Sequence, residues 1–124
     1  MPVVTFPVAG RDNCVVVAGI PYVYATVAGR GFVMRARCPH RGGPLHLAAP
    51  TADAVRLVCP WHEMKTSVAR LRAEIPAVRV GGTVTAVFPD RPAARGTDPA
   101  AEGEAGVRRE HRTLAPELAA RCPL

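Results

Sequence analysis

The sequence predicts a small all-β domain of antiparallel strands, and three observations lead to this fold class. The chain has 124 residues, 48% of them apolar, which suits one globular domain with a core of its own. Aromatic residues make up only 5%, so the core must come mainly from Val, Ala and Leu, and valine-rich runs favour strands. Between residues 5 and 88 these runs alternate with Gly and Pro, which is typical of short strands joined by turns.

The strands can be placed along the chain in order. Residues 15–18, 22–27 and 32–36 predict a meander, with a Gly-containing turn at 28–31. Residues 55–58 predict a further strand, which leads directly into Cys59. Residues 78–80 and 83–88 predict a closing hairpin around Gly81 and Gly82.

The composition changes near Pro89, which divides the chain into a domain over residues 1–89 and a tail over residues 90–124. Residues 90–106 hold almost no large apolar side chain and predict a flexible linker. Residues 107–121 predict a short helix with Leu114 and Leu118 on one face.

The formal net charge is +6, and arginine supplies nearly all of it, since Lys65 is the only lysine. The arginines of the strand region are scattered, without the clustered basic face or interleaved aromatics of a nucleic-acid reader. We therefore expect no nucleic-acid partner. A protein partner with acidic groups fits better, because complementary charge raises encounter rates.

The first thirteen residues lack the basic and apolar segments of a secretory signal. The longest apolar run, residues 14–29, is interrupted by Gly19-Ile20-Pro21 and is shorter than the roughly 20 residues that span a bilayer. We expect a soluble, cytoplasmic protein without membrane contact. Two of the four cysteines lie in motifs with His, which in the cytoplasm favours a metal site over disulfides.

The candidate chemistry lies in two segments, Cys38-Pro39-His40-Arg41-Gly42-Gly43-Pro44-Leu45 and Cys59-Pro60-Trp61-His62. Each segment supplies one thiolate and one imidazole from a loop at the end of a predicted strand. Two such loops can close around a two-iron cluster, with both cysteines on one iron and both histidines on the other. The same ligand types suit tetrahedral zinc, which stays open as the alternative.

Both segments resemble the Rieske family, whose motif runs Cys, any residue, His, any residue, Gly, two more, Leu, and later Cys, two residues, His. The matching residues are Cys38, His40, Gly42, Leu45, Cys59 and His62. The gap from His40 to Cys59 is similar to the family's spacing. The strand pattern is similar to the family's small antiparallel β domain, in which two loops bind the cluster.

This resemblance implies a [2Fe-2S] cluster as cofactor, with Cys38, His40, Cys59 and His62 as its ligands, and a role in electron transport. The two segments look more like Rieske ferredoxins and the Rieske domains of ring-hydroxylating oxygenases than like respiratory members. Beyond the ligands only His46 and His111 remain, so the sequence predicts no separate mononuclear iron and the chain is not an oxygenase by itself. We expect a carrier without catalytic residues, with a reductase and an oxygenase or related redox enzyme as protein partners.

Two other functions stay open. One is a small, tightly bound Rieske subunit of a larger redox enzyme, similar to the small subunit of nitrite reductases. The other is a non-catalytic binding protein in which the cluster, or zinc, only stabilises the fold. In each case we expect residues 90–124 to be dispensable for cluster binding, because no candidate ligand lies there.

Residues beside the ligands carry further expectations. Gly42 and Gly43 let the backbone approach the cluster closely, and Leu45 and Trp61 are expected to shield it from water. Most family members carry Gly after the second His, where this chain has Glu63, expected to be solvated. The segment from His62 to the closing hairpin is short, so we expect the strand pair that follows the second loop to be trimmed or missing.

High-potential members carry a hydroxyl residue and a Tyr at the positions of Met64 and Thr66, and an extra Cys in each loop at the positions of Gly43 and Trp61. None of the four matches, so the resemblance implies a potential at the lower end of the Rieske range. Outside the motifs, Cys14 is expected to be a buried thiol, and His46 and His111 to be surface imidazoles.

Overall fold

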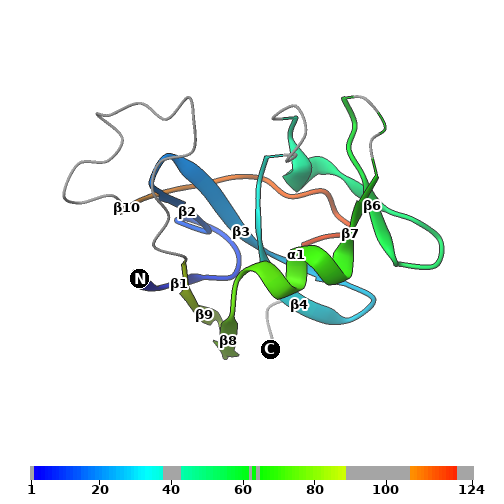
Figure 1. Ribbon diagram of the computed structural model, residues 1–124. Coiled ribbons are helices and arrows are strands. Elements are labelled where there is room, and N and C mark those ends of the chain that lie inside the picture. Colours follow the sequence, from blue (N-terminus) through cyan, green and yellow to red (C-terminus); the bar gives the residue numbers. More distant parts are fainter. Residues whose placement is uncertain (1, 38–42, 62, 64, 89–106, 120–124) are drawn as a thin grey trace.

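The computed structural model describes residues 2–37, 43–61, 63, 65–88 and 107–119. In this part of the chain the strands form three small antiparallel sheets, which confirms the predicted all-β fold (Figure 1). The predicted linker, residues 90–106, lies outside the described residues. None of the described helices is long and apolar enough to cross a membrane.

The largest sheet contains the predicted meander. Its strands are β2 (Cys14–Val17), β3 (Ile20–Val27) and β4 (Arg30–Arg35), and β10 (Val107–Glu110) pairs with the outer side of β2. The β2–β3 and β3–β4 hairpins turn through Ala-Gly pairs, at residues 18–19 and 28–29, in which both residues have positive φ. Turns of this kind match the twist of the strands they join.

The second sheet has the order β1 (Val3–Pro7), β9 (Thr83–Val87), β8 (Ala77–Val80). Strands β8 and β9 are the predicted closing hairpin, and Gly81, at φ 61°, supplies the positive φ of its two-residue turn. The sequence did not predict β1, because five residues ending in Pro7 form a strand only by pairing with β9 near the other end of the domain. The sheet therefore ties the start of the chain to its closing hairpin.

The third sheet is built from β5 (Ala49–Pro50), β6 (Arg56–Val58) and β7 (Lys65–Ser67), preceded by the 3₁₀ turn η1 (Leu45–Leu47). A single strand, β7, follows the second Cys/His segment and leads directly into the helix α1 (Val68–Glu74). The Ser67 hydroxyl accepts a hydrogen bond from the Arg70 backbone N–H and so caps the helix N-terminus. The helix packs against β4, where Arg35 and Glu74 form an ion pair.

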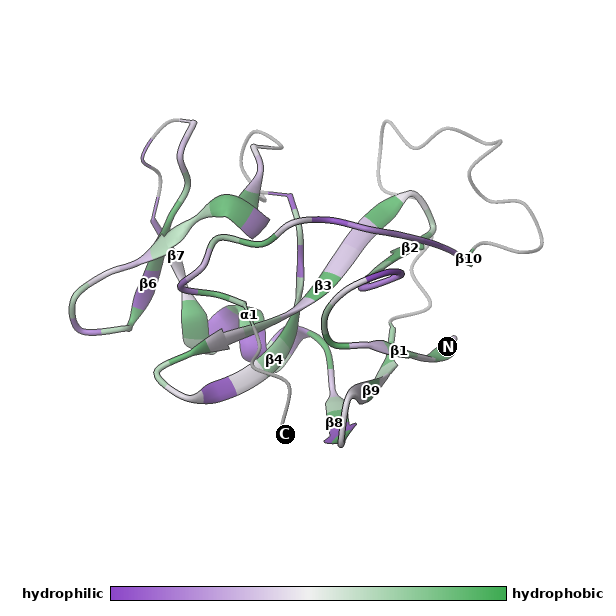
Figure 2. Ribbon diagram, turned by 180° about the vertical axis from the view of Figure 1, so that it is seen from behind, coloured by the Kyte–Doolittle hydropathy of each residue, from purple (hydrophilic) through white to green (hydrophobic). Residues whose placement is uncertain are grey.

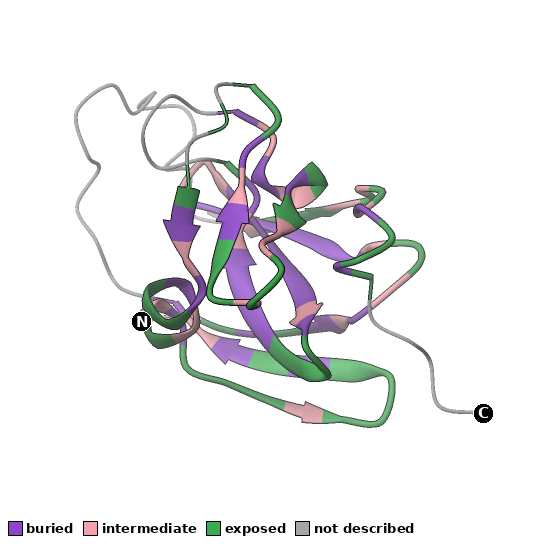
Figure 3. Ribbon diagram, turned by 90° about the vertical axis from the view of Figure 1, so that its right-hand side faces the viewer, coloured by how far each residue is buried: buried purple, intermediate pink, exposed green. Residues whose placement is uncertain are grey.

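Two buried clusters form the core (Figure 3). One lies between β3, β4, α1 and the third sheet, and includes Met34, Leu45 and Leu57. The other lies between the first two sheets, where the rings of Tyr22 and Phe88 pack with centroids 4.7 Å apart. Cys14 is buried in the first cluster, as predicted, and burial raises the pKa of its thiol.

The expected helix over residues 107–121 is wrong for the described part of that segment. Residues 107–110 are strand β10, and residues 111–119 then cross the molecule toward η1 (Figures 1 and 2). The Ala115 N–H donates to the His46 carbonyl at 3.0 Å, and Leu118 is completely buried in the first cluster. The predicted helix does not form, because the start of the segment pairs with a sheet and Leu118 packs into the core. These two contacts determine the conformation of the segment.

A buried side chain fixes where the segment passes β2. Asn13 donates from Nδ2 to the Arg112 carbonyl at 2.7 Å and accepts from the Arg112 N–H at 2.8 Å. These reciprocal bonds satisfy a buried amide and hold the segment at a defined register. Residues 107–119 are therefore part of the folded domain, in contrast to the expected flexible tail.

Candidate metal centre

The described ends of the two Cys/His segments, residues 43–45 and 59–61, lie close together (Figure 1). The base of the first loop is closed by a bridge between Arg37 and Pro44 and by a hydrogen bond of 2.9 Å from the Leu45 N–H to the Ala36 carbonyl. Leu45 itself is completely buried. The predicted ligands Cys38 and His40 fall between these anchored ends, and like His62 they lie outside the described residues.

Cys59 is the predicted ligand that the structure describes. It follows the end of β6, is 1% exposed and forms no disulfide. Its carbonyl accepts a hydrogen bond of 2.9 Å from the Glu63 N–H, which connects the two sides of the second loop. The thiol is therefore buried, reduced and fixed at the base of the second loop.

The two loops meet at Gly43. A Cβ added to Gly43 would lie 2.8 Å from the Cys59 Sγ and 3.2 Å from the Trp61 Cβ, so only glycine leaves this space free. The first loop thus brings bare backbone against the thiol of the second loop, where backbone N–H groups can approach a sulfur-rich centre. A buried thiol against a side-chain-free backbone fits a metal–sulfur cluster between the loops.

Comparison with known families decides which centre this is. The model of the Rieske [2Fe-2S] domain matches residues 4–80, which is more than half of the chain. The chain belongs to the Rieske family. No curated protein and no solved structure matches it.

The Rieske domain binds a [2Fe-2S] cluster and transfers electrons, so the alternative of zinc as the cofactor is wrong. The match ends at residue 80, whereas the fold of this chain also uses β9 and the segment 107–119. No group of three or more metal-binding side chains occurs among the residues that the structure describes, because three of the four predicted ligands lie outside them. The ligand set stays a prediction.

Glu63 stands where most Rieske family members have glycine, and its backbone has a conformation that favours glycine. Glu63 has φ 54°, in the left-handed region that glycine adopts readily and residues with a side chain avoid. Its side chain is exposed, as expected. Glycine therefore suits the backbone of the second loop at this position. In this chain the Glu63 backbone is strained instead.

The aromatic residue of the second loop lies on the surface. The Trp61 side chain is 61% exposed, and neighbouring Pro60 is exposed as well. On η1, Leu47 is also exposed, whereas Leu45 on the same turn is buried. The Rieske domain thus presents apolar side chains on the second loop and on η1.

The two histidines outside the predicted ligand set have different surroundings. His46 is half-buried rather than a surface imidazole, with Nδ1 3.2 Å from the Ala36 carbonyl. Burial lowers the pKa of His46, with a smaller effect in the same direction from the Arg112 charge. His111 is exposed, as expected.

Sequence reasoning missed one residue of interest, Thr66. The residue is 6% exposed, and its hydroxyl has no hydrogen-bond partner among the residues that the structure describes. The sequence carries no signal for this burial, because the register of β7 with β6 is what turns Thr66 inward.

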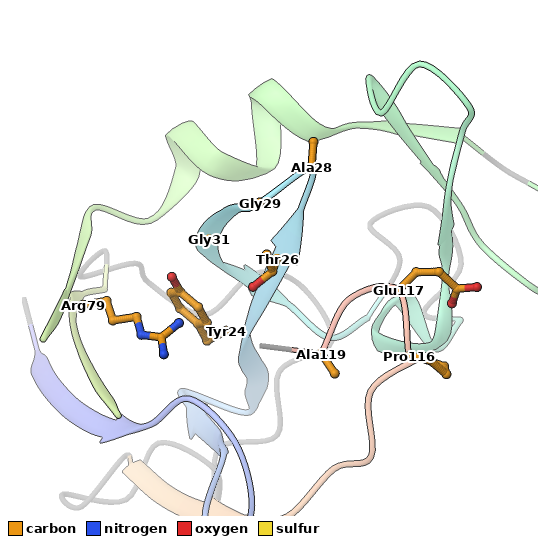
Figure 4. A pocket seen from close by; sticks show the side chains of 9 residues that line it. All are labelled: Tyr24, Thr26, Ala28, Gly29, Gly31, Arg79, Pro116, Glu117 and Ala119. Carbon is orange, nitrogen blue, oxygen red and sulfur yellow. The ribbon is translucent and has the colours of Figure 1, made fainter. Parts of the chain in front are cut away.

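A cavity of about 600 Å³ lies elsewhere on the Rieske domain, between Tyr24 and Arg79 on one side and Glu117 on the other (Figure 4). The Arg79 guanidinium lies over the Tyr24 ring, 5.5 Å from its centroid. The residues lining this cavity include no Cys or His, so the cavity is not the metal centre.

Proposed function

We propose that this protein is a soluble, cytoplasmic carrier that passes single electrons from a reductase to an oxygenase or related redox enzyme, and that it has no catalytic residues of its own. The observation that carries the proposal is the buried, reduced thiol of Cys59 against Gly43 in a chain of the Rieske family. When bound, the [2Fe-2S] cluster takes up and releases one electron at a time.

We assign the ligands as Cys38, His40, Cys59 and His62. The two cysteines would hold one iron as thiolates and the two histidines the other as neutral imidazoles, which would make that iron the more readily reduced one. Gly43 keeps side chains away from the thiolate of Cys59. Leu45 excludes water from the base of the first loop, because it is completely buried.

The exposed side chains around the loops suit contact with a redox partner. Trp61 and Leu47 offer apolar area, and the exposed cations Arg37 and Lys65 lie on the same two loop regions. An aromatic residue surrounded by polar groups is typical of the centre of a protein interface. The cations favour a partner with acidic groups, in line with the net charge of +6.

The ligand assignment is tested by substitution in anaerobically purified protein. Iron and acid-labile sulfide are measured per chain, and the reduced protein is examined by EPR, where mixed Cys/His ligation gives a low average g value. Cys59→Ser and His62→Ala should lose the cluster. Cys14→Ser and His46→Gln are the matched controls and should keep it, since Cys14 is also a buried free thiol and His46 lies just beyond the first loop. Wild-type protein without iron and sulfide would contradict the assignment.

One observation favours the second candidate, a tightly bound subunit of a larger redox enzyme. The outer face of the β1–β9–β8 sheet exposes Val3, Val78 and Val80 beside Thr5 and Thr85, and the described residues of these strands place no charge on that face. Size-exclusion chromatography of the protein from its native cells separates the two candidates. A free carrier elutes near its mass of 13.1 kDa, whereas a subunit elutes with larger proteins.

A further inference from the structure

Two neighbouring cavities lie beside Gly31, at the end of β4 that is farther from the first Cys/His segment. The larger one, of about 600 Å³, is the cavity between Tyr24 and Glu117 described above (Figure 4). The smaller one, of about 310 Å³, is lined by residues of α1, of β8 and of the connection between them. Tyr24, Gly31 and Arg79 line both cavities, so the two adjoin. Their volumes are those of sites that bind small molecules.

A glycine allows the Tyr24 ring to lie between the cavities. A Cβ on Gly31 would overlap the Tyr24 hydroxyl and the adjoining ring carbons, so the ring occupies the space that a side chain would take. Figure 4 shows the hydroxyl end of the ring directed toward Gly31. Tyr24 is buried whereas Gly31 is exposed. The phenol therefore crosses from the core toward the surface and brings its hydroxyl to the place where the cavities meet.

Two half-buried arginines line the smaller cavity, and an aromatic ring orients each of them. The Arg79 guanidinium lies 5.5 Å from the centroid of the Tyr24 ring, and its Nε donates to the Gly81 carbonyl at 2.7 Å. The Arg72 guanidinium lies 5.3 Å from the centroid of the Phe32 ring. Because stacking orients a guanidinium in advance, less entropy is lost when a ligand binds. Each guanidinium has five N–H donors, so bonds within the protein leave others for a ligand.

The smaller cavity is positively charged. Its described lining residues include no acidic side chain; they are Tyr24, Gly31, Phe32, Arg72, Ile75, Pro76, Ala77 and Arg79. The acidic residue of α1, Glu74, forms its ion pair with Arg35. In the larger cavity the Glu117 carboxylate points away from Arg79 (Figure 4). Two oriented guanidiniums in a wall without a carboxylate favour an anionic ligand.

We propose that these adjoining cavities bind a small organic anion, whose carboxylate or phosphate group contacts Arg72, Arg79 and the Tyr24 hydroxyl. Guanidinium groups suit both kinds of anion, because their N–H donors match paired oxygen atoms. Residues 75–77, which connect α1 to β8, offer apolar contacts to the body of the ligand. The site lies at the other end of β4 from the first Cys/His segment, so it does not depend on the cluster ligands assigned above.

Isothermal titration calorimetry of the cluster-loaded protein at constant ionic strength tests the proposal. The probes are phenyl phosphate and benzoate, with inorganic phosphate and acetate as the same anionic groups without an apolar body. Arg72→Gln, Arg79→Gln and Tyr24→Phe each remove one proposed contact, and Arg72→Lys keeps the charge without the planar fork. Arg70→Gln is the matched control, because Arg70 is an exposed arginine of α1 that lines neither cavity. Thermal unfolding followed by circular dichroism verifies that each variant is folded.

We expect an aromatic probe to bind more tightly than its anionic group alone, and the preferred group distinguishes phosphate from carboxylate. Arg72→Gln and Arg79→Gln should each weaken this binding by about tenfold or more, and Arg72→Lys and Tyr24→Phe by less. Arg70→Gln should bind like wild type.

Three results would overturn the proposal. One is wild-type protein that binds none of the probes, and another is aromatic probes that bind no more tightly than phosphate and acetate. The third is an equal loss of affinity in Arg70→Gln and Arg72→Gln, which would indicate general attraction to the net charge of +6. None of these results would contradict the proposed electron-carrier function, which is tested through the iron, sulfide and EPR signal of the cluster.

Discussion

The backbone of Gly43 lies so close to Cys59 that a single added carbon would come within 2.8 Å of the Cys59 Sγ. Gly43 belongs to the first Cys/His segment and Cys59 to the second, so this contact joins the described parts of the two segments. The nearby Trp61 Cβ, 3.2 Å from the same position, leaves no alternative direction for a side chain.

Gly43→Ala should therefore displace the Cys59 Sγ and weaken the hold on the cluster. The expected result is faster loss of the visible absorption of the cluster on incubation with an iron chelator. Gly82→Ala is the control, because a Cβ there has nothing within 4 Å, and it should behave like wild type. If the cluster of Gly43→Ala is lost no faster than that of wild type, the two loops can make room for the added methyl group without weakening cluster binding.

Leu118→Ala tests whether the segment after residue 106 belongs to the domain. The side chain is completely buried, so we expect the free energy of unfolding to fall by about 2–5 kcal/mol, as for other buried leucines. Urea unfolding measures the change, with exposed Glu117→Ala as a control expected within about 0.5 kcal/mol of wild type. If both variants behave like wild type, the segment is the dispensable tail that composition suggested.

Glu63→Gly should stabilise the protein. A residue with a Cβ at φ 54° costs about 1–2 kcal/mol, whereas glycine loses about 0.5–1 kcal/mol more backbone entropy on folding, which leaves a gain of roughly 0.5–1 kcal/mol. Glu63→Ala keeps the Cβ and should show no such gain. A Glu63→Gly protein less stable than wild type would mean that the carboxylate makes a favourable contact that offsets the strain.

His46 should make stability depend on pH. Burial holds its pKa below the ordinary 6.5, so below that pH the unfolded chain binds a proton that the folded protein takes up less readily. His46 thus contributes stability that is fully present above about pH 6.5 and is lost as the pH falls toward its folded pKa. Between pH 7.5 and 5.5, His46→Gln should lose less stability in urea unfolding than wild type or exposed His111→Gln; an identical loss in all three would contradict this.

The midpoint potential should lie near the lower end of the Rieske range, on the order of −150 mV. The loops lack the hydroxyl residue, the Tyr and the paired cysteines of high-potential members, since Met64, Thr66, Gly43 and Trp61 stand at those positions. His40 and His62 should then keep their distal protons, so the potential should change little between roughly pH 6 and 8. Voltammetry that gives a midpoint above about +100 mV at pH 7, or a clear slope with pH, would reveal further donors.

The fold class, the meander, the closing hairpin and the cofactor family could all be predicted from the amino-acid sequence. These features depend on local patterns: valine-rich runs between turns, and four Cys and His residues at short, characteristic spacings. Such patterns can be recognised without the tertiary structure, because turn chemistry and metal-ligand chemistry act over a few residues.

The other features depend on residues far apart in the chain, so they could not be predicted from local sequence. Strand β1 exists through β9, and residues 107–110 are a strand because β2 offers an open edge to them. Leu118 is core because it reaches the cluster of side chains around Leu45, and Thr66 is buried because the register with Leu57 turns it inward. Pairing and packing between distant segments outweigh the local preference of each, since burial and backbone hydrogen bonds stabilise a segment more than its intrinsic propensity.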